Sequence, residues 1–284
     1  MPDSRTYPFA DLALSRRLER TEAQSNIDFV EARAKAYPES RAVHVEVAGA
    51  HAMFDGVDSP LTQTFCLGIE QPVTKADLDR IESFFRDLGA PVFHEVSPLA
   101  DPTALALLSE SGYEPFEFTS VMYQPIRADM FADASKQGGV RARVIGLDEN
   151  EVWAETSARG WSESPELSAF MLTFSRVSAL KTSGHAFLAE LEGKPIAAGG
   201  LTIHGGVALF AGASTVPEGR RQGAQNALLE ARLRFAAERG CDVAMMCALP
   251  GSASQRNAER QGFRIAYTRI KWRKRVTYTA APAS

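Results

Sequence analysis

The segment from 216 to 225, VPEGRRQGAQ, has the residues of an anion-binding turn. A strand-like run precedes it, and a helix pattern follows it as far as Gly240. A helix N-terminus carries unpaired backbone amides and the positive end of the helix dipole, so it attracts phosphate groups. Gly223 permits a close approach of the backbone, and Arg220 and Arg221 add positive charge. The glycine patterns of dinucleotide-binding folds and of ATP P-loops are absent, so the turn is either a phosphate site of another kind or an ordinary strand-to-helix turn with surface arginines.

Composition excludes several classes of protein. The 284 residues are 45% hydrophobic and 23% charged, with a net charge of -4, which argues against a general nucleic-acid binder. No apolar run approaches the roughly 20 residues of a membrane span, and the N-terminus lacks the apolar core of a signal peptide. The three cysteines have spacings that fit neither a disulfide framework nor a zinc site, and nothing else suggests a metal. We therefore expect a cytoplasmic protein that binds no nucleic acid and no membrane.

Two series of helix and strand patterns position this turn. The first predicts a helix over 8–37, short strands between 42 and 69, a capped helix from Thr74 to Gly89, a strand at 91–97, a short helix and a strand at 113–123. The second predicts helical structure over 149–177, a hairpin at 185–206, a strand at 207–216, a helix at 224–239, a strand at 242–249, a short helix at 252–262 and a strand at 263–272. The basic window 269–275, RIKWRKR, is interpreted as a solvated strand end.

The two series share their order and their spacing. Gly89 is followed 23 residues later by Gly112 and Tyr113, and Gly240 is followed 22 residues later by Gly262 and Phe263. This agreement predicts an internal duplication. We expect a first domain at 1–127, a small polar linker at 128–139 and a second domain at 140–284.

The run VPEGRRQGAQNALL resembles the acetyl-CoA pyrophosphate loop of the GNAT superfamily of N-acetyltransferases, [RQ]-x-x-G-x-[GA] between a strand and a helix. Arg220 takes the first position and Gly223 the glycine position, whereas Gln225 stands where the family prefers Gly or Ala. The resemblance covers roughly residues 141–275. In the first half the matching place reads GIEQPV, with an acid and no arginine, so this copy is interpreted as degenerate. The implied fold class is α/β (α+β): two tandem GNAT-like domains, each a mixed, mostly antiparallel central sheet flanked by helices.

The resemblance also implies where acetyl-CoA, the cosubstrate, would bind. Residues 214–216 would pair with the pantetheine arm like an added strand, and the amide of Ser214 would polarise the thioester carbonyl. Amides of residues 221–225 would hold the pyrophosphate. Ser252 and Asn257 are further candidates for hydrogen bonds to the cofactor, with helix capping as the alternative role of the serine. The implied cofactor residues are Ser214, Thr215, Val216, Arg220, Arg221, Gln222, Gly223, Ala224, Gln225, Ser252 and Asn257.

The catalytic acid and base are not identified by the sequence. Many GNAT enzymes place a tyrosine five residues before the Gly-Phe phenylalanine, and this chain has Ala258 there. Water is an alternative proton donor for the thiolate. Candidates for catalysis are the Ser214 amide, Ser252 and Glu155, with Glu163 and Glu166 as further bases and ordinary solvated acids as the alternative. Trp161 is interpreted as an acceptor-site wall or a core residue, and Cys247 as a buried apolar residue rather than an acyl carrier.

Three functions remain open at this point. The first is an N-acetyltransferase that moves an acetyl group from acetyl-CoA to a small-molecule amine in the C-terminal domain, by direct attack. The second is a non-catalytic acyl-CoA-binding protein, with a sensor or regulatory role. A tandem-GNAT aminoacyl transferase that uses charged tRNA is disfavoured by the net acidity. The chain is expected to be a monomer or a homodimer.

Overall fold

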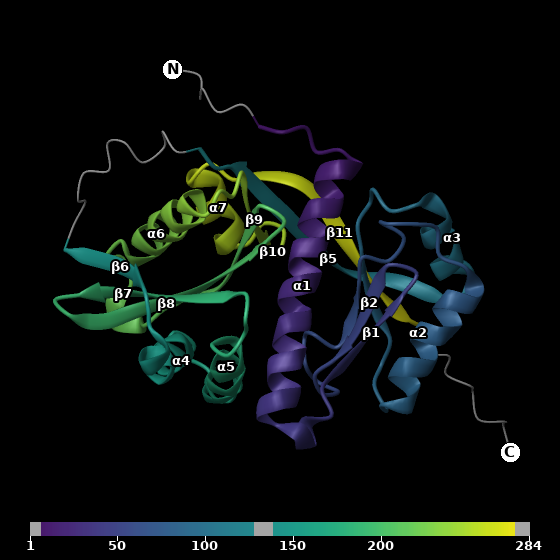
Figure 1. The fold of residues 1–284 in the computed structure, drawn as a ribbon, viewed down its shortest axis with the longest axis horizontal. Helices are drawn as coiled ribbons and strands as arrows, with labels where there is room; N and C mark the ends of the chain where they lie inside the picture. The colour runs from purple at the N-terminus through teal and green to yellow at the C-terminus, as the bar shows by residue number, and fades with distance from the viewer. Residues whose placement is uncertain (1–6, 128–138, 276–284) are drawn as a thin grey trace, which may run out of the picture.

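One sheet of eleven strands runs through the part of the chain that the structure describes (Figure 1). The computed structural model describes residues 7–127 and 139–275, which we call the N-terminal and C-terminal halves. The strand order is β1-β2-β3-β4-β11-β5-β10-β9-β8-β7-β6. The predicted linker lies outside the described residues except for Gly139, and the predicted domain boundaries stay a prediction.

The N-terminal half begins with one long helix and then alternates strands and helices. Its elements are α1 (Leu12–Ala36), β1 (Val43–Val47), β2 (Ala50–Phe54), β3 (Gln63–Phe65), α2 (Lys75–Asp87), β4 (Phe93–Val96), α3 (Pro102–Glu110) and β5 (Tyr113–Pro125). Helix α1 begins at Asp11, whose side chain accepts from the amide of Leu14. The predicted capping box of α2 is confirmed, because the Thr74 and Asp77 side chains each accept from the other residue's amide.

The C-terminal half repeats the same order, with an additional first strand and with two helices in place of one. Its elements are β6 (Val140–Val144), α4 (Asn150–Arg159), α5 (Pro165–Ser178), β7 (Gly184–Leu191), β8 (Lys194–His204), β9 (Val207–Thr215), α6 (Ala224–Glu238), β10 (Val243–Ala248), α7 (Ala253–Arg260) and β11 (Arg264–Lys274). The predicted helical stretch over 149–177 is two helices. Helix α4 ends at Gly160 and α5 starts on Pro165, which suits the first turn of a helix but not its interior.

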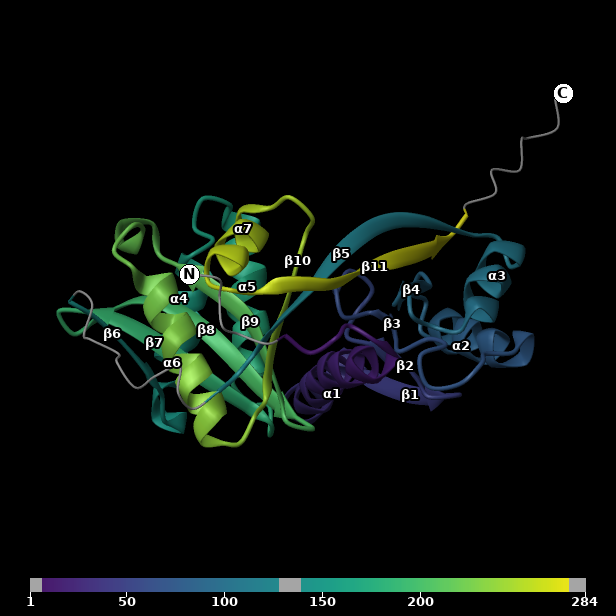
Figure 2. The same cartoon turned by 90° about the horizontal axis from the view of Figure 1, so that it is seen from above.

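The last strands of the two halves are exchanged. Strand β5 pairs with β10 of the C-terminal half, and β11 pairs with β4 of the N-terminal half; β5 and β11 also pair with each other. Figure 2 shows these two strands crossing together from one half to the other. Apart from this exchange the pairings match: β2–β3 and β8–β9 are antiparallel, while β3–β4 and β9–β10 are parallel. The mixed, mostly antiparallel sheet expected from the sequence is confirmed.

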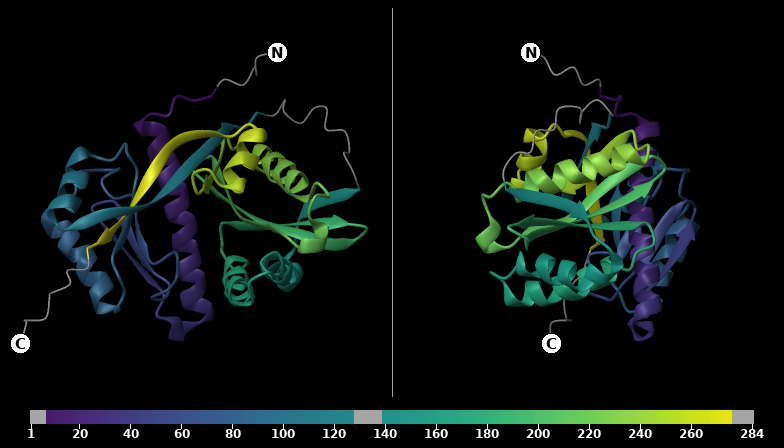
Figure 3. Two further views of the ribbon diagram at one scale, coloured as in Figure 1. Left: turned by 180° about the vertical axis from the view of Figure 1, so that it is seen from behind. Right: turned by 60° about the vertical axis from the view of Figure 1, so that its left-hand side comes forward.

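Helices cover both faces of the sheet in the C-terminal half. Helices α4 and α5 lie on one face and α6 on the other (Figure 3), where the α6 residues Leu228, Leu233 and Ala236 are buried in the main core. Helix α1 lies between the halves and contacts α5, β8 and β9 as well as β1 and β2. A helix of the N-terminal half therefore forms part of the surroundings of the C-terminal sheet.

Candidate active site

A gap opens in the sheet between β9 and β10. These parallel strands pair only where Val243 to Met245 meets Val207 to Leu209. Beyond that point β10 pairs with β5 alone, and the β9 residues Ala211 to Ala213 are exposed although the strand lies inside an eleven-stranded sheet. Exposed backbone at this place is a ready site for an extended ligand, which can pair with it as an added strand.

The ladder between β8 and β9 defines which amides face this gap. The amide of Val216 donates to the carbonyl of Ile196 on β8, at 3.0 Å. Donor directions alternate along an antiparallel pair, so the amide of Ser214 also points to β8 and that of Thr215 points to the gap. The expected role of the Ser214 amide at the thioester is therefore corrected: this amide belongs to the ladder. The Ser214 hydroxyl donates to the carbonyl of Ser157 at the end of α4.

The turn before α6 has the backbone of an anion-binding nest. Arg221 and Gly223 both have left-handed φ angles, 63° and 83°. Successive backbone amides in a turn that contains such residues can face one concave surface. Helix α6 has no side-chain cap at Gly223, so the amides of its first turn are left for another acceptor. A Cβ added to Gly223 would meet nothing within 4 Å, so the space beside the turn is open.

Two side chains of the turn already have partners. The Arg220 guanidinium donates to both carboxylate oxygens of Glu163, at 2.7 and 3.1 Å, and this contact lowers the pKa of Glu163. The pair is exposed, and exposed pairs add little stability, so a diphosphate can replace the carboxylate. Gln225, where the family prefers a small residue, donates to the Thr215 hydroxyl at 2.7 Å and leaves its own backbone amide at the helix start.

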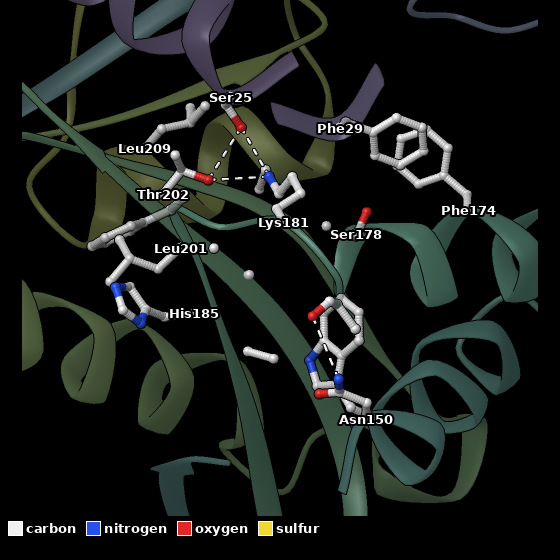
Figure 4. Close-up of a pocket in the computed structure, with 18 of the residues that line it drawn as sticks. Ser25, Phe29, Asn150, Phe174, Ser178, Lys181, His185, Leu201, Thr202 and Leu209 are labelled. Carbon is white, nitrogen blue, oxygen red and sulfur yellow. Dashed lines mark hydrogen bonds between the residues drawn. The ribbon is translucent and has the colours of Figure 1, made fainter. Parts of the chain in front are cut away.

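A cavity of about 450 Å³ adjoins the gap, on the face of the sheet covered by α4 and α5 (Figure 4). Helix α1 closes one side of it. Its wall includes Gly212 of β9 and Cys247 of β10, on either side of the gap, and the aromatic rings of Phe29 and Phe174, which stack at 4.4 Å. The buried indole of Trp153 donates to the carbonyl of Gly199 and completes the apolar wall. The position and size of this cavity suit a small acceptor molecule.

A buried cluster of charges stands at the end of the cavity nearest Cys247. The Arg269 guanidinium, 1% exposed, contacts three carboxylates: Glu19 at 3.4 Å, Glu22 at 2.7 Å and Glu95 at 3.1 Å. The prediction that Arg269 belongs to a solvated strand end is therefore wrong, although Arg273 and Lys274 beyond it are exposed. One cation faces three acids, so the cluster has an excess of acidic groups.

Burial shifts the titration of this cluster. It raises the pKa of Glu19 to about 7, against the opposing field of Arg269. It also raises the pKa of the Cys247 thiol well above its usual range, so the sulfur is held as a thiol. That thiol donates to Glu22 at 3.1 Å. A protonated thiol is a poor nucleophile, which agrees with the interpretation of Cys247 as something other than an acyl carrier.

Glu22 is the acid of the cluster that reaches the cavity. Its side chain is 16% exposed and lines the wall beside Cys247. The sequence does not single out Glu22, because α1 has the pattern of a polar helix of the N-terminal half. The signal that was available is the chain of acids at Glu19 and Glu22, three residues apart and so on one face of the helix.

The acids chosen from the sequence lie elsewhere. Glu155, Glu163 and Glu166 are exposed, and none of them lines the cavity. Trp161 is 40% exposed in the loop between α4 and α5, so it forms neither the cavity wall nor the core; Trp153 forms the wall instead.

The helix α7 candidates have local roles in the structure. The Ser252 hydroxyl accepts from the amide of Gln255 and caps α7, and Asn257 is exposed on the same helix. Ala258, at the position of the usual tyrosine, is buried in the main core. The described parts of this helix therefore supply no side-chain acid at the expected place.

The described residues, 7–127 and 139–275, hold no cluster of three or more His, Cys, Asp or Glu side chains suited to a metal ion. None of their helices is long and apolar enough to cross a membrane.

Comparisons with known proteins agree with this geometry. Residues 149–263 match the model of the acetyltransferase (GNAT) family. A GCN5-related N-acetyltransferase from Kribbella flavida has a similar structure, with a TM-score of 0.60, 21% identity, and 88% of this chain and 95% of that chain covered. A tandem GNAT protein from the clavulanic acid biosynthesis pathway is also similar, with a TM-score of 0.59 and 13% identity. The match covers 94% of this chain and 96% of that chain.

A GCN5-related N-acetyltransferase from Sphaerobacter thermophilus has a TM-score of 0.52 and 18% identity. The match covers 79% of this chain and 76% of that chain. At these identities the structures speak for the fold alone. A search of curated proteins finds no match. Residues 149–263 are thus a domain of the GNAT acetyltransferase family, in a chain whose overall fold is that of a tandem GNAT protein.

Proposed function

We propose that this protein is an acetyl-CoA-dependent N-acetyltransferase whose single active site lies at the gap between β9 and β10. One observation carries the proposal. The gap has an open, uncapped helix N-terminus at one end and meets the cavity with Glu22 at the other. A turn that can bind the diphosphate and a cavity that can bind the amine substrate are thus joined by a strand edge, and this edge can hold the pantetheine arm.

The residues of the C-terminal half would hold acetyl-CoA. The amides of Arg221 to Gln225 and the Arg220 guanidinium would bind the diphosphate, in place of Glu163. The amide and carbonyl of Thr215, on the side of β9 that faces the gap, would pair with the pantetheine arm. A donor fixed in this way also polarises a nearby thioester carbonyl without reorganising during the reaction.

Glu22 is the proposed base. Its carboxylate attracts a protonated amine into the cavity and takes one proton, so that the nitrogen can attack the thioester carbon. The carbon–nitrogen bond forms and the carbon–sulfur bond breaks. The second amine proton goes to the departing thiolate through water, since Ala258 offers no hydroxyl, and Glu22 returns its proton to solvent.

Glu22→Gln tests this assignment. With acetyl-CoA and a panel of primary amines, thiol release by the variant should fall about 100-fold in kcat, the usual contribution of a general base. Acetyl-CoA affinity should stay unchanged, because Glu22 does not contact the pyrophosphate turn. Glu31→Gln is the matched control: Glu31 is on the same helix, exposed and outside the cavity.

A second function is favoured by one observation, the burial of Ala258 at the tyrosine position. A protein that binds acyl-CoA without turnover has no need of that hydroxyl. Background thiol release over the whole amine panel, with acetyl-CoA still bound, would support this non-catalytic function and exclude the transferase.

A further inference from the structure

Three polar side chains meet on the wall of the cavity. Lys181 precedes β7, Ser25 is on α1 and Thr202 is on β8 (Figure 4). The Lys181 ammonium donates to the Ser25 hydroxyl at 2.9 Å and to the Thr202 hydroxyl at 3.1 Å. The two hydroxyls are 3.1 Å apart, and both residues are buried. We call these three residues the lysine cluster.

The lysine cluster contains a cation without an acidic partner. Within the described residues no carboxylate lies within 4.0 Å of the Lys181 nitrogen, so it forms no ion pair there. The acid that acts on it from nearby is Asp28, whose two oxygens already accept from Gln24 and Ser183. Burial lowers the pKa of Lys181 to about 8. A desolvated ammonium of this kind is stabilised when an anion binds beside it.

The donors of the cluster fit a carboxylate. An ammonium has three donors and no acceptor, and two of the three are engaged by the hydroxyls. One of the two hydroxyls donates a hydrogen bond to the other, so the proton of the second hydroxyl remains free to donate. One N–H and one O–H are therefore available at adjacent positions, and a carboxylate accepts two such hydrogen bonds.

The two charged ends of the cavity are close together. Glu22 and Lys181 are the only Asp, Glu, Lys or Arg side chains on its described wall. Ser25 follows Glu22 by three residues on α1, which places the two on one face of the helix about 5 Å apart. An acceptor with its amine at Glu22 and its anion at the lysine cluster thus has only a few bonds between them. The Phe29 and Phe174 rings form an apolar surface beside it.

We infer that the acceptor is an amino acid with an apolar side chain, whose carboxylate binds to Lys181, Ser25 and Thr202 while its amine faces Glu22. This inference rests on the proposed transferase function. A different account is that Lys181 only joins α1 to β8, and the two accounts differ in what they expect of acceptor preference and of stability.

Matched acceptors separate these accounts. The pairs are phenylalanine with phenylalaninol, leucine with leucinol and valine with valinol, in which the carboxylate alone is replaced. The wild-type protein should prefer the acid of at least one pair by roughly 10- to 100-fold in kcat/KM, as a charged hydrogen-bonded contact provides. Lys181→Met should bring that ratio close to one through a higher KM for the acid. Lys194→Met, at an exposed lysine on β8, should keep the wild-type ratio.

Stability gives the second readout. The pKa of Lys181 is lowered in the folded state, so the charged lysine costs stability below about pH 8 and that cost disappears as the pH rises to its unfolded value of 10.5. Lys181→Met should melt at the same temperature as the wild type or higher at pH 7. Thr202→Val, which removes one hydroxyl and no charge, should lower the acid-to-alcohol ratio by a smaller factor.

The outcomes distinguish this inference from the function on which it rests. Equal rates for the acid and the alcohol of every pair in the wild type, or a preference for the alcohols, would overturn the carboxylate site while acetyl transfer stands. A lower melting temperature of Lys181→Met with an unchanged ratio would mean that Lys181 is only structural. If no amine releases thiol, the proposed function fails. Calorimetry with N-acetyl-L-phenylalanine then still decides the site, since binding must be present in the wild type and lost in Lys181→Met.

Discussion

Helices α2 and α6 each follow a central strand and occupy equivalent places in the two halves. Their N-termini differ, because that of α2 is capped by side chains and that of α6 is not. Helix α2 is closed by its own residues: Thr74 and Asp77 satisfy its first amides in a capping box. Helix α6 starts at Gly223 with no side-chain cap and with open space beside it. A carboxylate at a helix start occupies both the amides and the positive end of the dipole. A helix at this place in the fold can therefore either be capped by its own side chains or leave its amides for a phosphate group. Helix α2 is capped, and the N-terminus of α6 is open.

The turn before each helix follows the same division. In the N-terminal half Glu70 lies in the turn and forms ion pairs with Arg16 and Arg20 of α1. Gly68 packs against α3, where an added Cβ would lie 2.7 Å from Ala104. The N-terminal turn is therefore filled from within the protein. A turn filled in this way has no space for a phosphate group, which supports the prediction that this copy is degenerate.

Gly223→Val should have the largest effect on the comparison. The branched side chain fills the open space and disfavours the φ angle of 83°, so the nest of amides is lost. Acetyl-CoA affinity should fall by about 100-fold or more, measured by calorimetry. Gly240→Val is the matched control, since Gly240 has φ 74° and open space at the other end of the same helix. If both variants lose affinity equally, the effect is one of folding and the site assignment fails.

Glu19→Gln tests the junction through which α1 joins the halves. The pKa of Glu19 is raised from 4.5 to about 7, so its contribution to stability is complete below pH 4.5 and is lost as the pH rises through 7. Gln stays neutral at every pH. The variant should match the wild type in urea unfolding at pH 4.5 and exceed it by about 3 kcal/mol at pH 8. A variant that is less stable at pH 8 would show that the ionised carboxylate is required.

Arg220→Glu should weaken acetyl-CoA binding about tenfold, because it replaces a phosphate partner by a repelling charge. Glu163→Gln should raise affinity slightly, since it frees the arginine. Arg176→Glu is the control: Arg176 is an exposed arginine paired with Glu151 on the same half. Unchanged affinity in Arg220→Glu would contradict the assignment of the turn.

Thr74→Ala should have the smallest effect. It removes the cap of α2 and should lower the free energy of unfolding by about 1 kcal/mol, measured in urea. Acetyl-CoA affinity should not change. A loss of affinity in this variant would place a ligand in the N-terminal half.

Local features of the fold were predictable from the sequence. Residue-level patterns gave the limits of α1, α2 and α6, the capping box at Thr74, the hairpin of β7 and β8, and the turn at Gly223. Each of these depends on neighbours in the chain. The break between α4 and α5 was missed, although Gly160 and Pro165 stand at its ends.

Features that depend on distant partners were not predictable. Strands β5 and β11 have similar patterns, and a pattern does not say which half a strand joins. Arg269 reads as one more basic residue, since its burial depends on Glu19, 250 positions away. The joint role that we propose for Glu22 and Lys181 depends on the packing of α1 against β8. The proposed cofactor side of the site is local and could be predicted from the sequence, while the proposed acceptor side is assembled by tertiary contacts.

The stoichiometry of acetyl-CoA binding tests whether the two halves differ in their ability to bind phosphate. One half has an open helix N-terminus beside a gap, and the other is closed by its own side chains. Calorimetric titration of the wild-type chain should therefore give one acetyl-CoA per chain. Two sites per chain, or none, would contradict the account.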